Sequence, residues 1–362
     1  MRNFLKLDWV LLSSVFLLIT IGLITLYSMS SFEEGQGLDY FSKQLIAVGI
    51  GIFLMLFFSF FDYRVLISYS TKLYFGAILI LLGLLVWGVT VRGTTGWIKL
   101  GLFNLQPVEV TKLIMIIFLA SFLAVKKTYF SITVRVMASI VLISVPIILI
   151  MQQPDFGSSV IIMGIWLIMI FVSGMNKRTV AGLVIFGVIA SSSGWFMLRD
   201  YQKERLINFV NPEQDPLGSG YNVIQSIIAV GSGGMWGKGL GHGSQSQLNF
   251  LPEKHTDFIF AVFAEEFGFF GSAVVLGLFS ILFYRIKEAA RLARDNFGYL
   301  MAVGVSAMLF FQVLVNIGMN IGIAPVTGVP LPFLSYGGSS MIVVLASVGL
   351  IQSIYIRRLK SL

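Results

Sequence analysis

The chain has 362 residues, of which 57% are hydrophobic and only 12% are charged, whereas about 25% of the residues of an ordinary globular domain are charged. The net charge is +8, but the basic residues stand singly between apolar runs, which argues against a nucleic-acid-binding protein. Cysteine is absent, which excludes disulfides, a thiolate nucleophile and a Cys-ligated zinc site. So apolar a composition predicts a protein embedded in a membrane.

Apolar runs long enough to cross a ~30 Å hydrocarbon core recur along the whole chain and predict an all-α polytopic membrane protein. We expect ten spans, near residues 9–29, 44–61, 71–91, 108–125, 133–151, 157–173, 178–198, 257–284, 299–319 and 337–356. The first run has spanning length and lacks a small-residue cleavage site, so we expect it to remain as a helix. The chain should form a single integral membrane domain, 1–362.

The distribution of charge orients these spans. When the N-terminus is placed in the cytoplasm, Lys and Arg are twice as numerous in the inner loops as in the outer ones, as the positive-inside rule requires. An even number of spans then places both termini in the cytoplasm. Most carboxylates fall on the outer face, together with a large extracytoplasmic loop, 199–256, between the seventh and eighth spans. Loops of this length are usually functional or disordered, and the apolar stretches 221–230 and 248–251 favour a folded loop, so we expect a site there.

Asp257 stands where this loop enters the eighth span. It could act as a general base at the boundary between membrane and water. The alternative is a helix cap, made by Thr256 or by Asp257 itself, because a carboxylate is favoured at a helix N-terminus. The neighbouring Glu253, Lys254 and His255 make the cluster denser than a cap requires.

Other ionisable residues fall inside the expected spans. Glu265 and Glu266 follow Asp257 along the eighth span and lie roughly 12 Å deeper. A cation on a neighbouring helix is the favoured partner for them, and a polar cavity is the alternative. Glu109 and Lys112 are three residues apart, hence on one helix face, which favours a neutralising structural pair over a pair that shapes a substrate cavity.

Two stretches rich in glycine are candidate ligand-binding segments. The run 237–243 lacks the spacing of a nucleotide-binding motif, and His242 and His255 lack the spacing of a metal motif. The run 329–340 ends in Gly-Gly-Ser-Ser, and this sequence opens the last span. Backbone N–H groups at such a helix start could bind an anion such as a lipid diphosphate, while capping by Ser335 or Ser339 is the alternative.

Several of these stretches carry a family resemblance. Gln106-Pro-x-Glu-x-x-Lys112, Gln153-Pro-Asp-x-Gly157, the run from Gln245 to Ala261, Ala264-Glu-Glu-Phe-Gly268 and Pro330–Ser340 resemble the SEDS family, which includes RodA, FtsW and SpoVE. The opening Asp8-Trp9 and the run from Asp215 to Ser226 are more similar to the RodA branch than to the FtsW branch. The resemblance covers nearly the whole chain, in order.

The resemblance implies a peptidoglycan glycosyltransferase of the bacterial cytoplasmic (inner) membrane, which polymerises lipid II through β-1,4 bonds during cell elongation and rod-shape maintenance. It also implies a partner, a class B penicillin-binding protein that supplies transpeptidation. By resemblance, Asp257 is the essential aspartate, and Glu109 with Lys112 is the family's Glu–Lys pair. Asn249 departs from the pattern, since many members carry an acidic residue there.

This chemistry needs a base for the acceptor hydroxyl and positive charge for the lipid diphosphate that leaves. Candidate substrate-binding or cavity-shaping residues, besides Glu109 and Lys112, are Arg92, Lys99, Lys238, Lys254, His255, Ser339 and Ser340. A divalent cation, Mg²⁺ or Mn²⁺, could assist, with Asp257 as a candidate ligand. No nucleotide cofactor is expected.

Two other functions remain open: a lipid II flippase, and a scaffold of the cell-elongation machinery. A transporter places its ionisable residues near the membrane midplane on broken helices, whereas the carboxylates here gather at the outer boundary. A scaffold explains the spans but not the dense polar loop. Both comparisons favour the enzyme.

Overall fold

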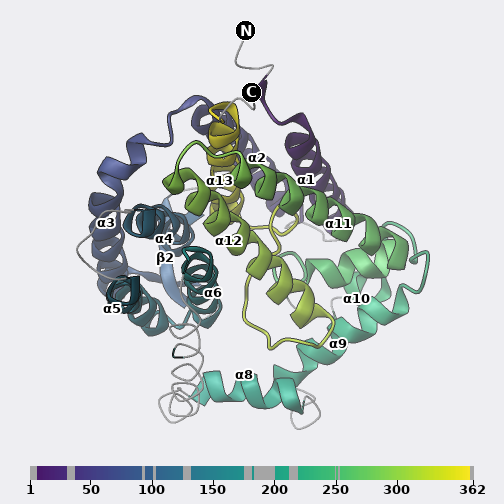
Figure 1. Ribbon diagram of the computed structural model, residues 1–362. Helices are drawn as coiled ribbons and strands as arrows, with labels where there is room; N and C mark the ends of the chain where they lie inside the picture. Colours follow the sequence, from purple (N-terminus) through teal and green to yellow (C-terminus); the bar gives the residue numbers. More distant parts are fainter. Residues whose placement is uncertain are drawn as a thin grey trace.

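The computed structural model describes residues 6–30, 37–91, 94–100, 103–124, 132–174, 182, 200–211, 219–248, 250–251 and 253–358 (Figure 1). Its elements are α1 (Trp9–Ser30), α2 (Gly37–Phe60), α3 (Val65–Trp87), β1 (Val89–Val91), β2 (Thr94–Leu100), β3 (Phe103–Leu105), α4 (Pro107–Ala124), α5 (Ile132–Gln152), α6 (Phe156–Val172), α8 (Asp200–Val210), α9 (Ser219–Ser232), α10 (Ser244–Gln247), α11 (Ile259–Arg291), α12 (Asn296–Asn320) and α13 (Gly338–Ile356).

Within these described residues, eight helices are long and apolar enough to cross a membrane: α1, α2, α3, α4, α5, α11, α12 and α13. α6 is a shorter apolar helix of 17 residues. A helix therefore stands at nine of the ten expected spans. The span expected at 178–198 lies outside the described residues, apart from one position. The chain is a multi-pass membrane protein.

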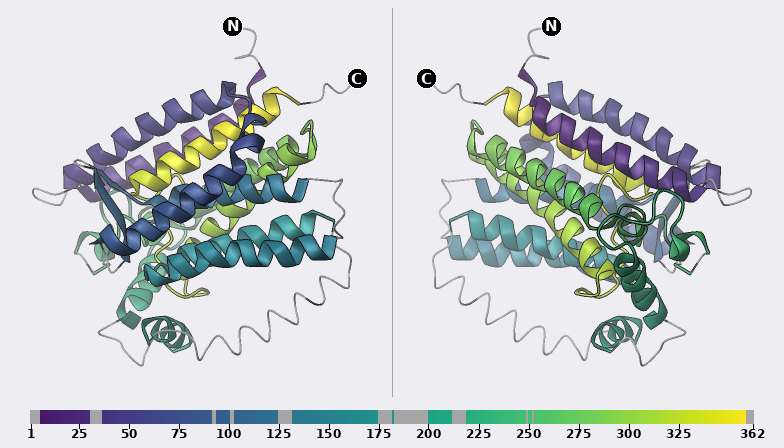
Figure 2. Two further views of the ribbon diagram at one scale, coloured as in Figure 1. Left: turned by 90° about the vertical axis from the view of Figure 1, so that its left-hand side faces the viewer. Right: turned by 90° about the vertical axis from the view of Figure 1, so that its right-hand side faces the viewer.

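The long helices form one bundle (Figures 1 and 2). α12 packs on α4, α6 and α11, while α13 lies along α2. Small residues allow these close approaches: a side chain at Gly349 would collide with the backbone of Met55, and one at Gly304 with Ile116. Such small-residue contacts are typical of helices in membranes, where packing rather than water drives association.

A small antiparallel sheet, in the order β1-β2-β3, corrects the all-α prediction. Val89 pairs with Trp97, and Lys99 pairs with Asn104. The span expected at 71–91 ends early, at Trp87, because Gly88 is extended and the β-branched run that follows favours a strand. The sheet lies between α3 and α4 in the chain and contacts both helices.

α11 is interrupted at Gly268, whose φ of 66° and ψ of −160° are not helical. The loop after α9 hydrogen-bonds the backbone groups that the break releases: Lys238 N and Gly239 N donate to the carbonyls of Glu265 and Glu266, both at 3.0 Å. On the other side, Phe269 N donates to Gly234 O at 2.9 Å. Broken helices are tolerated at membrane depth only where protein or water satisfies their backbone in this way.

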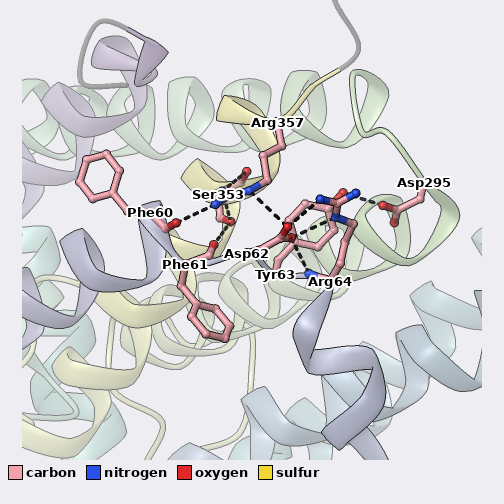
Figure 3. Close-up of polar contacts among 8 residues, drawn as sticks. All are labelled: Phe60, Phe61, Asp62, Tyr63, Arg64, Asp295, Ser353 and Arg357. Atoms are coloured by element: carbon pink, nitrogen blue, oxygen red, sulfur yellow. Dashed lines mark hydrogen bonds and ion pairs between the residues drawn. The ribbon is translucent and has the colours of Figure 1, made fainter. Parts of the chain in front are cut away.

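Polar contacts join the turns at one end of the bundle (Figure 3). Arg357 at the end of α13 donates to Phe60 O at 2.6 Å and lies 3.8 Å from Asp62, which is paired with Arg64 at 2.6 Å. Tyr63 donates to Asp295, in the turn before α12, at 2.7 Å. The hydrogen bond and charge of Arg64 lower the pKa of Asp62 to about 2.

The same end holds the start of α1 and the end of α13. The side-chain amide of Gln352 donates to Asp8 O at 3.0 Å and accepts from Asp8 N at 2.9 Å. Asp8 also forms an ion pair with Arg285 at 2.7 Å, near the far end of α11. Asp257, which directly precedes the other end of α11, therefore lies toward the opposite end of the bundle.

Candidate functional site

A cavity of about 140 Å³ opens at that opposite end. Its walls come from β2, from the residues before α4 and α6, from α8, and from the segments that precede α11 and α13. Asp257, Asp155 and Arg205 contribute the charged groups among the described lining residues. Segments distant in sequence thus converge on one polar cavity.

Asp257 lies in the turn 253–258 and is partly buried. The N-cap position of α11 is Phe258, whose side chain cannot accept a hydrogen bond. The first-turn N–H of Ala261 instead donates to the side chain of Asn320 at 3.0 Å, and the hydroxyl of Thr256 donates to Glu253 O at 3.3 Å. The capping interpretation of Asp257 and Thr256 is therefore wrong, and Asp257 lines the cavity.

The backbone around Asp257 is held by residues of α12 and of the segment before α13. Asn316 and Asn320 each donate a side-chain N–H to Asp257 O at 3.0 Å. Ser335 donates to Thr256 O at 2.6 Å, and Tyr336 N donates to His255 O at 2.9 Å. The sequence analysis missed both asparagines, although polar residues four positions apart in an apolar span are a usable signal.

The N-terminus of α13 opens on the same cavity. Its N-cap is Gly337, which has no side chain, and Gly337, Gly338, Ser339 and Ser340 all line the wall. Ser339 donates to Asn104 O at 3.2 Å and accepts from Gln106 N at 2.9 Å. Ser335 is engaged with Thr256, as described above. Capping of α13 by Ser335 or Ser339 is therefore wrong, and the helix start presents its backbone to the cavity.

Lys112 and Glu109 form a buried ion pair at 2.7 Å, with side chains 1% and 3% exposed. Both belong to the first two turns of α4, immediately after Gln106, which lines the cavity. In the described part of the chain, neither charged side chain reaches the cavity wall. Glu109 and Lys112 thus neutralise each other in a buried pair.

The other predicted cations lie elsewhere. Of the described residues Lys99, Lys238 and Lys254, none lines the cavity. Lys238 pairs with Glu265, and Lys254 donates to Ser246 O at 2.9 Å. Lys99 is exposed on β2. Arg205 of α8 lines the cavity instead, and no sequence signal ranked it above the other basic residues of its loop.

His255, Arg92 and Asn249 were also singled out in the sequence. His255 is buried and stacks on Tyr40, with ring centroids 4.8 Å apart. Arg92 and Asn249 lie outside the described residues.

Glu265 and Glu266 are fully buried and face protein donors. Glu265 accepts from Lys238 Nζ at 2.8 Å and from Gln245 N at 3.0 Å, while Glu266 accepts from Ser28 Oγ at 2.7 Å and from Gly241 N at 3.0 Å. Glu265 pairs with a cation as expected, although Lys238 comes from a loop and not from a neighbouring helix. For Glu266 the expected cation is wrong, since its partners among the described residues are a hydroxyl and a backbone N–H. Both carboxylates anchor that loop on α11.

Almost the whole chain is similar to one family of known proteins. The family model FTSW_RODA_SPOVE, "Cell cycle protein", matches residues 8–359. The chain is 38% identical to "Peptidoglycan glycosyltransferase MrdB" of Escherichia coli (strain K12), over 97% of this chain and 95% of that protein. It is 40% identical to "Stage V sporulation protein E" of Bacillus subtilis (strain 168), over 96% of each.

Solved structures agree. One, described as "Structural coordination of polymerization and crosslinking by a peptidoglycan synthase complex", matches 96% of this chain and 97% of its own with a TM-score of 0.82 and 32% identity. The rod shape determining protein RodA of Thermus thermophilus matches 98% and 99% with a TM-score of 0.73 and 28% identity. The chain belongs to the FtsW/RodA/SpoVE family of cell cycle proteins, the SEDS family.

Proposed function

We propose that this protein is a peptidoglycan glycosyltransferase that polymerises lipid II into β-1,4-linked glycan strands during cell elongation. Full-length relatives bear the name of that activity. The observation that carries the mechanism is the pairing, in one cavity, of the Asp257 carboxylate with the open N-terminus of α13. The first is a base and the second an anion site, which are the two functions that this transfer requires.

In the proposed reaction, Asp257 takes the proton of the acceptor hydroxyl as its oxygen attacks the anomeric carbon of the donor sugar. The bond between that carbon and the lipid diphosphate breaks, and the diphosphate leaves with the electron pair. Arg205 and the backbone N–H groups at Ser339 and Ser340 stabilise its charge. The sugar nucleophile needs one well-placed base and no nucleotide.

A divalent cation would fit this donor set as an auxiliary. The cavity offers the carboxylates of Asp257 and Asp155, and Mg²⁺ is commonly held by one or two carboxylates together with substrate phosphates. Asp155 also accepts from Ser158 N at 2.9 Å. Within the described residues, no group of three or more His, Cys, Asp or Glu side chains forms a metal cage of its own. A bound Mg²⁺ or Mn²⁺ would supply charge for the diphosphate.

The cavity end of the bundle would face the outside of the bacterial cytoplasmic membrane, and both termini would face the cytoplasm. Arg64, Arg285 and Arg357 lie at the other end and belong to the expected inner loops, where Lys and Arg are in excess, which supports this orientation. The partner would be a class B penicillin-binding protein, in agreement with the solved synthase complex that the chain resembles.

A lipid II flippase is the second candidate, and the broken α11 with its buried carboxylates is the observation that favours it. The contacts weigh against it, because Glu265 and Glu266 are bound by protein donors and the released backbone groups are bound by protein donors or acceptors. A scaffold role would not need the cavity.

The deciding experiment is polymerisation of lipid II by the purified protein, with and without its penicillin-binding partner. We expect glycan strands, a one-to-one complex in mild detergent, and higher activity in the complex. Translocation of lipid II across vesicles without polymer formation would support the flippase. Full activity without any co-purifying partner would remove the partner from the proposal.

A further inference from the structure

Two asparagines of α12, Asn316 and Asn320, bind the peptide of Asp257. The helix α12 packs beside α11 (Figure 1). Each asparagine donates a side-chain N–H to Asp257 O at 3.0 Å, and both side chains are 0% exposed. They stand one helical turn apart, so both reach the same carbonyl. An uncharged amide pair buried in a membrane span is costly unless its hydrogen bonds are made, and here one bond from each amide reaches the same residue.

The two amides also bind the segment before α13 and the first turn of α11, which both lie beside the Asp257 carbonyl. The same nitrogen of Asn316 donates to Val329 O at 2.8 Å, in the segment that includes Gly328 beside the Asp257 carboxylate. The oxygen of Asn320 accepts from Ala261 N at 3.0 Å in the first turn of α11. Asn320 therefore supplies, from another helix, a side-chain acceptor for the first turn of α11, whose N-cap residue Phe258 has none.

A consequence concerns the direction of the Asp257 side chain. A capping aspartate turns its carboxylate back toward the first-turn N–H groups, whereas the N-cap position of α11 is Phe258 and no side chain there accepts from them. The carboxylate instead lines the cavity. Its Oδ2 lies 3.5 Å from the position that a Cβ atom at Gly328 would occupy. The Asp257 carboxylate therefore lines the cavity while two side chains of α12 bind the carbonyl oxygen of the same residue.

We propose that Asn316 and Asn320 are positioning residues for catalysis: they hold the Asp257 backbone from α12, and Asn320 also binds the first turn of α11, so that the Asp257 carboxylate points at the substrate. The inference rests on the proposed role of Asp257 as base. Since a displacement of about 1 Å can cost ~10²-fold in rate, loss of either asparagine should act on kcat.

The test replaces each asparagine by the nearly isosteric leucine, Asn316→Leu and Asn320→Leu. We expect kcat for lipid II polymerisation to fall about 10- to 100-fold with little change in KM, because the asparagines touch Asp257 and not the substrate. The matched control is Gln312→Met, one turn earlier on α12, where the amide is also 0% exposed and hydrogen-bonds to none of the described residues. It should retain the wild-type kcat.

A merely structural role would lower the unfolding temperature in detergent while leaving kcat per folded molecule unchanged, which would overturn the inference. If the leucine variants do not fold, Asn316→Ser and Asn320→Ser keep a smaller polar group at each site, and the same split of kcat from KM applies. A wild-type kcat in folded serine variants would likewise overturn it.

Asp257→Asn separates this inference from the function on which it rests. If Asp257→Asn polymerises at the wild-type rate, the proposed base is wrong. If Asp257→Asn is inactive but the asparagine variants are fully active, only the positioning inference fails. In the Asp257→Asn background, Asn316→Leu should cause no further loss of residual activity, since residues that act as one unit are not additive.

Discussion

Lys112 Nζ lies 2.7 Å from Glu109 Oε1, and the two side chains are buried against each other in the first turns of α4. Glu109→Ala or Lys112→Ala leaves one charge buried without its partner, at a cost of about 3–5 kcal/mol. We expect each single change to damage expression and activity more than the double change does. A double-mutant cycle on folded yield and polymerisation measures this, and strict additivity would show that the pair does not act as one.

Asp257→Asn should abolish polymerisation while expression and partner binding persist. The change keeps the size of the side chain and removes its negative charge and its capacity to take a proton, so we expect a loss of at least ~10²-fold. The measurement is strand elongation with titrated Mg²⁺ or Mn²⁺. Rescue by the cation would identify Asp257 as a metal ligand, and a wild-type rate without it would remove the residue from the mechanism.

The orientation can be tested with cysteines, because the chain has none of its own. A cysteine at Ser219 should react with an impermeant thiol reagent in intact cells, since α9 belongs to the expected outer loop. A cysteine at Ser361 should react only after the cells are opened. Labelling of position 361 in intact cells would reverse the proposed topology.

Tyr63→Phe tests the contacts at the end of the bundle opposite the cavity. It keeps the ring that stacks on Phe297 and removes the hydrogen bond to Asp295, with an expected loss of about 1–3 kcal/mol.

Burial, and then the hydrogen bond to Asp295, raise the pKa of Tyr63 above its ordinary value of 10. The folded state therefore prefers the neutral phenol. The stability that Tyr63 contributes is fully present below about pH 10 and is lost as the pH rises through the folded-state pKa. Thermal unfolding in detergent should show wild type losing its advantage over Tyr63→Phe above that pH. Parallel curves throughout would contradict the assignment.

The long helices could be predicted because the length of an apolar run is a local property that the bilayer imposes. The elements that the sequence analysis missed depend on contacts between distant segments. The break at Gly268 needs the loop after α9 to bind the released backbone groups, and no local pattern announces it. The sheet that contains Lys99 is short and lies between two helices.

The same contrast holds within the site. Asp257 could be found because charge beside an apolar run is conspicuous, and the resemblance pointed to the same residue. The orientation of Asp257 could not be predicted, because its backbone is bound by Asn320, which lies more than fifty positions further along the chain. Lys238 was a candidate cation for the site, but it forms an ion pair with the buried carboxylate of Glu265 instead. The sequence shows which charged residues are present, whereas the contacts between them depend on how distant segments pack.

The break in α11 also has a consequence for biogenesis. A helix that leaves the translocon alone must satisfy its own backbone, and α11 cannot do so around Gly268. The residues that complete it, Gly234 to Gly239, are synthesised before it and are therefore already present when α11 emerges. We expect α11 to reach the bilayer as a unit with the loop that precedes it, so that shortening this loop would impair membrane insertion before it impairs catalysis.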